Sequence, residues 1–180
     1  TGELYAEFSH PRTMDVRLGI SSKLDFKHIK EVWEGIVAAA KEHGYKNVSL
    51  DLLPSPNGLT VSVSCTGETS LLMAKRRPAA KSMDLICVSD NLGAAYMGLQ
   101  LLEREKIAAA DKDIQPDFQG KEYILERQLK PEARKEIIEK LREENIKPTA
   151  MIDISDGLSS ELMHICRQSG TGCRIYEERI

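Results

Sequence analysis

The residues best suited to chemistry lie in the run Met-Ile-Asp-Ile-Ser-Asp-Gly-Leu-Ser-Ser at positions 151–160. It places the carboxylates of Asp153 and Asp156 and the hydroxyl of Ser155 between an apolar segment and a predicted helix. Carboxylates suit Mg²⁺, which prefers hard oxygen ligands, and a helix N-terminus favours phosphate oxygens. The same residues also fit a structural interpretation, in which Ser155 or Asp156 caps the helix and Gly157 permits the turn.

Two further places carry candidate side chains. Asp51 ends a predicted strand, where an aspartate can bind a metal or simply form a turn. The basic group Lys75-Arg76-Arg77, with Lys81 beyond it, could hold a phosphate through an arginine fork, or could be the ordinary charge of an exposed linker. Nothing resembles a lysine phosphate-binding loop, a dinucleotide glycine fingerprint or a Ser/His/Asp triad.

Composition narrows the class of protein. The 180 residues carry 25 basic and 28 acidic side chains, with a net charge of −3, so binding to nucleic acid through a strong positive field is not expected. No apolar run reaches the roughly 18 to 20 residues of a membrane span, so no membrane partner is expected. The four cysteines form no paired metal-binding spacing, which fits a reducing, cytoplasmic location.

Hydrophobic periodicity predicts the elements that position these residues. In the first part, apolar residues alternate over 14–20, a helix begins after Asp25 and ends before Gly44, and strands follow over 48–52 and 59–65. This is a β–α–β–β order, with one polar sheet face and one face covered by the helix. We expect the 54–58 segment to form the turn between the last two strands.

The second part alternates strand and helix, which predicts an α/β unit. Strands are expected over 85–88, 150–154 and 173–176. Helices are expected from 92, over 121–130, from Pro131 as the first helical residue, and over 158–168, with a loop over 112–120.

Together these motifs resemble thiamine-monophosphate kinase, over nearly the whole chain. The resemblance rests first on Ile152-Asp-Ile-Ser-Asp-Gly-Leu-Ser-Ser-Glu-Leu162. It is strengthened by further runs, at 84–89, 92–99, 128–134 and 58–63, and by Tyr5-Ala6, Pro11-Arg12, Gly67-Glu68, Ser169-Gly170 and 173–177. The family sequence continues on both sides of this region, with an acidic metal-binding segment upstream, so the chain is expected to be an internal fragment or a divergent copy.

The resemblance implies an α/β, two-domain fold of the aminoimidazole ribonucleotide synthetase type. Residues 1–68 would be part of an N-terminal domain that binds ATP and dimerises through its sheet, 69–83 a linker, and 84–180 part of a C-terminal α/β domain. The implied reaction is Mg²⁺-dependent transfer of the γ-phosphoryl group of ATP to thiamine monophosphate, giving thiamine diphosphate in a homodimer. The isolated 180 residues are expected to be weakly active or inactive.

Residue roles carry over by motif. The resemblance implies that Asp51, Asp153 and Asp156 bind metal, that Asp51, Arg77 and Ser155 contact ATP, and that Glu3 stands where the family has a metal-binding aspartate. It implies no covalent nucleophile, because an oxygen of the substrate phosphate attacks directly.

The chain departs from the family pattern mostly around the implied nucleotide site. These departures leave two other interpretations of the chain open. It would be a non-catalytic module that keeps the fold and dimer surface, or another phosphotransferase or synthetase of the superfamily. Leu50 is expected to obstruct the approach of backbone to phosphate, since it stands at a family glycine. The departures are Glu3 for Asp, Phe8 for Asn, Ser49 and Leu50 for Gly-Gly, Leu52 and Leu53 for polar residues, and Ala79 and Asp90 for Gly.

Overall fold

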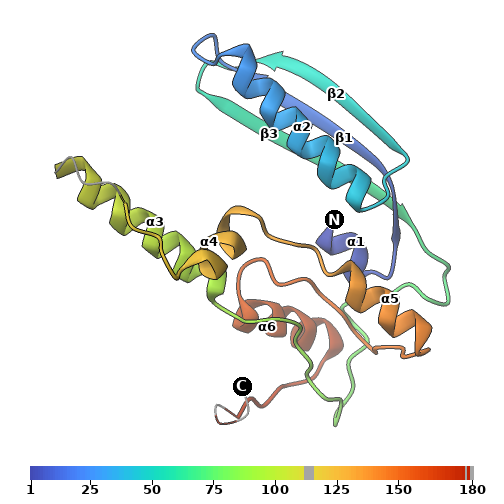
Figure 1. The fold of residues 1–180 in the computed structure, drawn as a ribbon. Coiled ribbons are helices and arrows are strands. Elements are labelled where there is room, and N and C mark those ends of the chain that lie inside the picture. Colours follow the sequence, from blue (N-terminus) through green and yellow to red (C-terminus); the bar gives the residue numbers. More distant parts are fainter. Residues whose placement is uncertain (112–115, 177, 179–180) are drawn as a thin grey trace. The chain divides into compact units, whose positions relative to one another are not determined.

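The computed structural model describes residues 1–111, 116–176 and 178 (Figure 1). The chain forms two compact units, Thr1–Arg76 with Ile138–Asp153, and Arg77–Ile137 with Ile154–Ile180. The elements in chain order are α1 (Gly2–Ala6), β1 (His10–Ile20), α2 (Phe26–Glu42), β2 (Asn47–Pro54), β3 (Leu59–Glu68), α3 (Ala94–Asp111), α4 (Glu122–Leu129), α5 (Lys135–Glu143) and α6 (Leu158–Ser169).

The first unit contains a small sheet in the order β2-β1-β3, which confirms the predicted β–α–β–β succession. The central strand β1 pairs in parallel with β2 and antiparallel with β3. Helix α2 connects the two parallel strands and lies along one face of the sheet (Figure 1). Parallel neighbouring strands are usually joined by a crossover helix, because a short hairpin turn can join only antiparallel strands.

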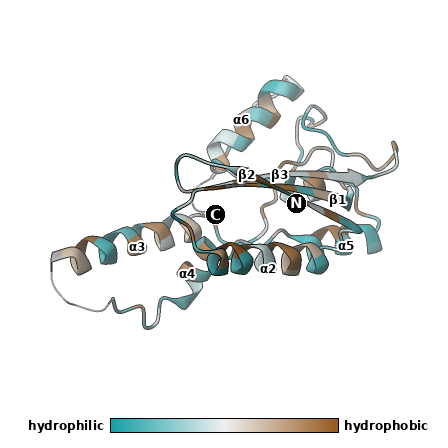
Figure 2. Ribbon diagram, turned by 90° about the horizontal axis from the view of Figure 1, so that it is seen from above, coloured by the Kyte–Doolittle hydropathy of each residue, from teal (hydrophilic) through white to brown (hydrophobic). Residues whose placement is uncertain are grey.

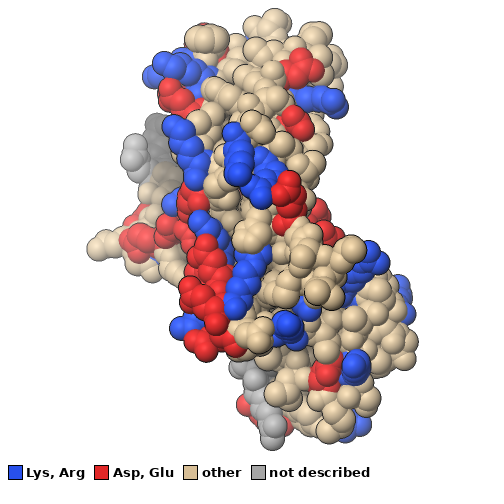
Figure 3. Space-filling model, turned by 90° about the vertical axis from the view of Figure 1, so that its right-hand side faces the viewer, with Lys and Arg blue, Asp and Glu red and all other residues tan. Residues whose placement is uncertain are grey.

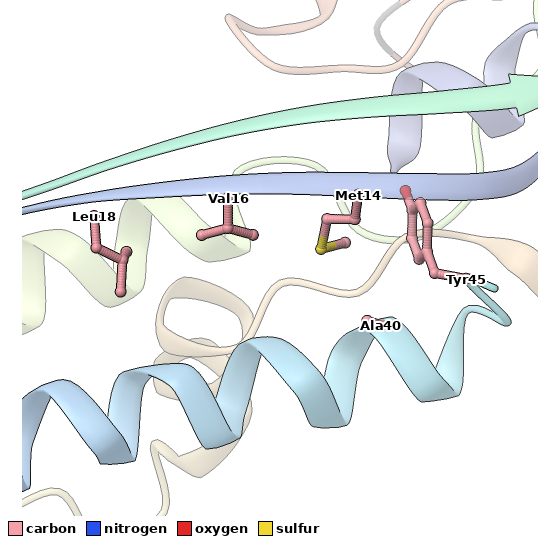
Figure 4. Packing of buried hydrophobic residues seen from close by; sticks show 5 residues of the cluster. All are labelled: Met14, Val16, Leu18, Ala40 and Tyr45. Atoms are coloured by element: carbon pink, nitrogen blue, oxygen red, sulfur yellow. The ribbon is translucent and has the colours of Figure 1, made fainter. Parts of the chain in front are cut away.

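The core of this unit lies between β1 and α2 (Figure 4). Alternate β1 residues Met14, Val16 and Leu18 point toward the helix, with Val16 1% and Leu18 0% exposed. Ala40 and Tyr45 close the cluster from the helix side. Full burial of such a side chain contributes roughly 1.5–3 kcal/mol, so this layer fixes the sheet against α2. Hydrophobic and hydrophilic residues alternate in bands along α2 in Figure 2.

The other face of the sheet is polar, as the alternation predicts. The register places Asp15 opposite Ser49 of β2 and Ser64 of β3, and Ser49 donates a hydrogen bond of 2.5 Å to the Asp15 carboxylate. Arg17 follows two residues later on the same face, between Asp51 and Ser62. Hence Asp51 belongs to a polar surface that α2 does not cover.

The predicted ends of α2 are also confirmed. Asp25 is its N-cap residue, and the main-chain oxygen of Asp25 accepts from His28 at 3.1 Å. His43 is the C-cap, and Gly44 follows with φ +73°, a left-handed conformation that glycine adopts without steric cost.

In the second unit α3 packs directly against α4. A Cβ on Gly98 of α3 would lie 2.1 Å from the main-chain oxygen of Ile124 in α4, which no side chain can tolerate. The absence of a side chain therefore permits this close approach of the two helices. This contact anchors the start of α3 beside Tyr123 and Arg127.

Three predicted strands are wrong. Residues 85–88, 150–154 and 173–176 contain no strand, because no strand within the described residues lies beside them to share a hydrogen-bond ladder. Pro131 is also not the first helical residue, since α5 begins at Lys135. The short helix α1 was not predicted, and part of the predicted loop over 112–120 lies outside the described residues.

The helices of the second unit otherwise match the predicted ones, with α3, α4 and α6 beginning or ending within a few residues of the expected positions. Among the described helices, none combines the length and the apolar character needed to cross a membrane.

Candidate functional site

In the first unit, Asp153 lies beside the N-terminal helix α1. Its Cβ and Oδ2 atoms are 3.7 and 3.8 Å from the position that a Cβ on Gly2 would take, which is van der Waals contact distance. Asp153 is partly buried, and Glu3 follows Gly2 directly. Helix α1 is held in place by Thr1, whose hydroxyl lies 3.0 Å from the hydroxyl of Tyr45. The packing thus brings Asp153 to the segment that carries Glu3.

Asp51 lies on the uncovered face of β2 and is paired in register with Arg17. Leu50 is paired with the buried Val16 and so projects to the α2 side of the sheet. The side chain of Leu50 therefore points away from that of Asp51, because neighbouring residues of a strand point to opposite faces. The expected obstruction of backbone approach to phosphate at this position stays a prediction. Leu53, two residues beyond Asp51, does share its face and is 46% exposed.

In the second unit, Ser155 and Asp156 form the turn before α6. The buried carboxylate of Glu161 accepts a hydrogen bond from the Asp156 main-chain N–H at 3.2 Å and one from the Ser155 hydroxyl at 3.5 Å. The N-cap residue of α6 is Gly157, with no side-chain cap, so the interpretation that Ser155 or Asp156 caps the helix is wrong. Both residues are exposed.

Arg77 is attached through its main chain to the end of α6. The Ser169 hydroxyl donates to the main-chain oxygen of Arg77 at 3.0 Å and accepts from the N–H of Ala80 at 3.1 Å. Among the described residues the guanidinium of Arg77 forms no ion pair, and the residue is exposed. The fold fixes the backbone of this arginine and leaves its charge free for an anion.

Phe8 occupies a position that favours a small or amide residue. Its φ is +59°, the left-handed region that Asn and Gly enter most readily, which agrees with the asparagine of the family pattern. The ring is 1% exposed and lies 5.4 Å from the Arg142 guanidinium and 5.9 Å from the Lys75 ammonium. Arg142 also donates to the main-chain oxygen of Phe8 at 2.9 Å. Burial and two cation–π contacts offset the cost of the backbone conformation.

His10 lies next to this group. Arg142 Nη1 is 3.3 Å from Nδ1 of His10. Burial, and then the positive charges of Arg142 and Arg12, lower the pKa of His10 below its ordinary value of 6.5, although Glu139 opposes the shift. Burial also lowers the pKa of Arg142.

The two units divide the predicted site residues between them. The first contains Glu3, Asp51 and Asp153, and the second contains Arg77, Ser155 and Asp156. Within the described part of the chain, no group of three or more His, Cys, Asp or Glu side chains is close enough to hold a metal ion. Acidic and basic side chains are mixed on the surface seen in Figure 3, with no broad basic area.

The sequence analysis missed the two residues that organise the surroundings, Glu161 and Arg142. Glu161 had a usable signal, a carboxylate in the first turn of a helix that follows a Ser-Asp-Gly turn. Arg142 had none, because its contacts with Phe8 and His10 join distant parts of the sequence.

Comparison with known proteins gives one consistent result. No family model matches the chain. The thiamine-monophosphate kinase of Bacillus subtilis is 29% identical over 94% of this chain and 50% of its own length, and that of Pyrococcus horikoshii is 34% identical over 91% of this chain and 47% of its own length. The chain thus spans about half the length of the curated relatives it matches.

Solved structures agree at the level of the fold. AaThiL complexed with AMPPCP and TMP has a TM-score of 0.78 at 24% identity, covering 94% of this chain and 50% of that one. Hydrogenase maturation protein HypE in complex with ATP has a TM-score of 0.60 at 18% identity, covering 92% of this chain and 46% of that one. The chain is therefore an α/β protein with a small sheet that is similar, along almost its whole length, to thiamine-monophosphate kinases, as its motifs predict.

Proposed function

We propose that this chain is the central part of a thiamine-monophosphate kinase, which transfers the γ-phosphoryl group of ATP to thiamine monophosphate and forms thiamine diphosphate. The observation that carries the proposal is the similarity to such kinases over 94% and 91% of the chain, which includes the Asp-Ile-Ser-Asp-Gly turn. AaThiL was solved in complex with AMPPCP, an ATP analogue, and with TMP. These two compounds correspond to the two substrates of the proposed reaction.

Magnesium fits the side chains that the fold presents. Asp153 and Glu3 lie on adjoining segments of the first unit. Carboxylate oxygens are the hard ligands that Mg²⁺ prefers, and the resemblance assigns this role to Glu3, Asp51, Asp153 and Asp156. When bound, Mg²⁺ neutralises phosphate charge during phosphoryl transfer.

The chain's own residues would bind and orient the nucleotide. Arg77 presents a guanidinium without an ion pair among the described residues, suited to a phosphate oxygen, from a backbone tied to Ser169. Ser155 would contact the nucleotide through its hydroxyl oxygen, from a turn that Glu161 holds. Both act by positioning, since direct attack by a substrate phosphate oxygen needs no protein nucleophile.

We further propose the two-domain aminoimidazole ribonucleotide synthetase-like arrangement, with partial domains over 1–68 and 84–180 and a linker over 69–83. A homodimer formed through the sheet is supported by the outer edges of β2 and β3, which pair with no other strand among the described residues. A cytoplasmic location is supported by the free thiols of all four cysteines.

A phosphotransfer assay tests the proposal. The chain, with ATP, Mg²⁺ and thiamine monophosphate, is expected to form thiamine diphosphate slowly, as measured by liquid chromatography. Asp153→Asn is expected to abolish turnover, because it removes a carboxylate charge next to α1. Asp117→Asn is the matched control, since this carboxylate lies in an exposed loop, where it accepts from the Gln119 N–H. Turnover of Asp153→Asn equal to that of the control would contradict the metal role.

A non-catalytic module is the second candidate. It is favoured by the fully buried Phe8 at an implied asparagine position and by the lack of a three-ligand cluster among the described side chains. Such a module would keep the fold and form no thiamine diphosphate at any Mg²⁺ concentration.

A further inference from the structure

A carboxylate in the loop before α3 is held by two arginines from other elements. Oδ2 of Asp90 lies 2.5 Å from Nη2 of Arg127, which is in α4, and 2.9 Å from Nη2 of Arg134, which lies between α4 and α5. The side chain of Asp90 is only 19% exposed. Arginine guanidinium groups form strong hydrogen bonds with phosphate oxygens as well as with carboxylate oxygens.

Further donors face the same point. The neighbouring main-chain N–H of Asn91 is the main reason that the pKa of Asp90 lies below its ordinary value. The Tyr123 hydroxyl donates to Oδ1 of Asp90 at 3.4 Å and accepts from the side-chain amide of Asn91 at 3.0 Å. Nε of Arg134 is buried and has no hydrogen-bond partner among the described residues. The donors therefore exceed what one carboxylate uses.

The charges at this place are not balanced by Asp90 alone. Arg127 and Arg134 supply two positive charges, and Asp90 supplies one negative charge. Glu136 pairs with the other end of Arg134 at 3.1 Å, but its side chain is 60% exposed, so solvent weakens that pair. A dianion in place of the carboxylate would neutralise both guanidinium groups.

The backbone of Asp90 is suited to a residue without a side chain. Its φ is +76°, a left-handed conformation that is strained for most L-residues and that glycine adopts without steric cost. The close packing of Gly98 on Ile124 fixes the main chain of α4, which carries Tyr123 and Arg127, against α3. Removal of the carboxylate should thus leave these two donors on a fixed helix, with Arg134 beside them.

We propose that Arg127, Arg134, Tyr123 and the Asn91 N–H form a binding site for a tetrahedral oxyanion, either free phosphate or a phosphate monoester. The Asp90 carboxylate occupies this site as an internal ligand, and an external anion must displace it. This site is separate from the residues to which the proposed kinase reaction assigns a role.

Calorimetric titration of the chain at low ionic strength tests the proposal, with inorganic phosphate in one arm and phenyl phosphate in the other. Asp90→Gly is expected to bind at least one of the two about tenfold more tightly than the unaltered chain does. The arm with tighter binding shows whether the free anion or the monoester is preferred. The double variant Asp90→Gly/Arg134→Gln is expected to lose this gain, because it lacks one of the two guanidinium groups.

Asp90→Asn provides a second variant that keeps the size of the side chain and removes its charge. It is expected to bind phosphate more tightly than the unaltered chain and more weakly than Asp90→Gly, because the amide still fills the site. The proposal is overturned if folded Asp90→Gly, checked by circular dichroism, binds neither anion more tightly than the unaltered chain. If Asp90→Gly does not fold, unchanged binding by Asp90→Asn overturns it.

Discussion

At the scale of single residues, the two aspartates of the 151–160 run have different surroundings. Asp153 is partly buried beside Gly2, whereas Asp156 is exposed in a turn whose main-chain N–H is bound by Glu161. Similar residue types three positions apart thus depend on different neighbours. Asp153 is positioned by packing in the first unit, whereas the main chain of Asp156 is positioned by the buried side chain of Glu161.

The role of Glu161 gives a stability prediction. Glu161→Ala is expected to lower the free energy of unfolding by about 1–3 kcal/mol, because the Asp156 N–H and Ser155 hydroxyl lose their acceptor. Glu161→Gln is expected to cost less, since its amide oxygen can still accept. Urea denaturation measures both, with Ser159→Ala on the exposed side of the same helix as control. Equal effects of Glu161→Ala and Ser159→Ala would show that the carboxylate does not hold the turn.

His10 gives a pH prediction. Because burial and the neighbouring arginines lower the pKa of His10 in the folded protein, the unfolded chain binds a proton more readily below about pH 6.5. The free energy of unfolding is therefore expected to fall as the pH decreases through 6.5 toward the folded-state pKa of this residue. His10→Asn should make the decrease shallower, and the exposed His164→Asn is the control. A His10→Asn profile that overlays the parent profile would contradict this account.

At the scale of elements, glycines of two helices make a matched pair. Gly98→Ala is expected to lower the free energy of unfolding by about 1–3 kcal/mol, because a new Cβ would meet the Ile124 carbonyl. Gly35→Ala, in α2 with no atom within 4 Å of a new Cβ, should raise it by about 0.5–1 kcal/mol. Thermal and urea unfolding report both changes. A neutral Gly98→Ala would mean that α3 and α4 pack less closely than described.

The elements also show what the sequence could predict. Strands β1 and β3 follow from their period of two, and α2 follows from its apolar face between Asp25 and Gly44, because these signals are local. The segments over 85–88 and 173–176 have strand composition but no neighbouring strand among the described residues, and pairing is not a local property. The face to which Leu50 projects likewise follows from its pairing with Val16, which joins distant parts of the sequence.

For the candidate site, the sequence predicted which residues are candidates but not which residues they contact. Asp153, Ser155 and Asp156 could be found from residue type and spacing alone. The contacts of Asp153 with α1 and of Arg142 with Phe8 could not, because each joins residues more than a hundred positions apart.

At the scale of the whole molecule, the charge of −3 and the mixed surface in Figure 3 fit a protein that would meet anionic substrates through carboxylate-bound Mg²⁺ rather than through a basic surface. The chain is similar to about half the length of the relatives described above. From the proposed function we expect one biochemical property of it. It should recognise Mg²⁺ and ATP together.

Calorimetric titration of the chain with ATP, with and without Mg²⁺, tests this expectation most directly. We expect saturable ATP binding that requires Mg²⁺. Asp153→Asn is expected to raise the Kd for ATP about tenfold, which is about 1.4 kcal/mol, and Asp117→Asn is expected to leave it unchanged. The proposal that these carboxylates take part in nucleotide binding would be contradicted by either of two results. The folded chain would bind no ATP, or it would bind ATP equally well in the presence of EDTA.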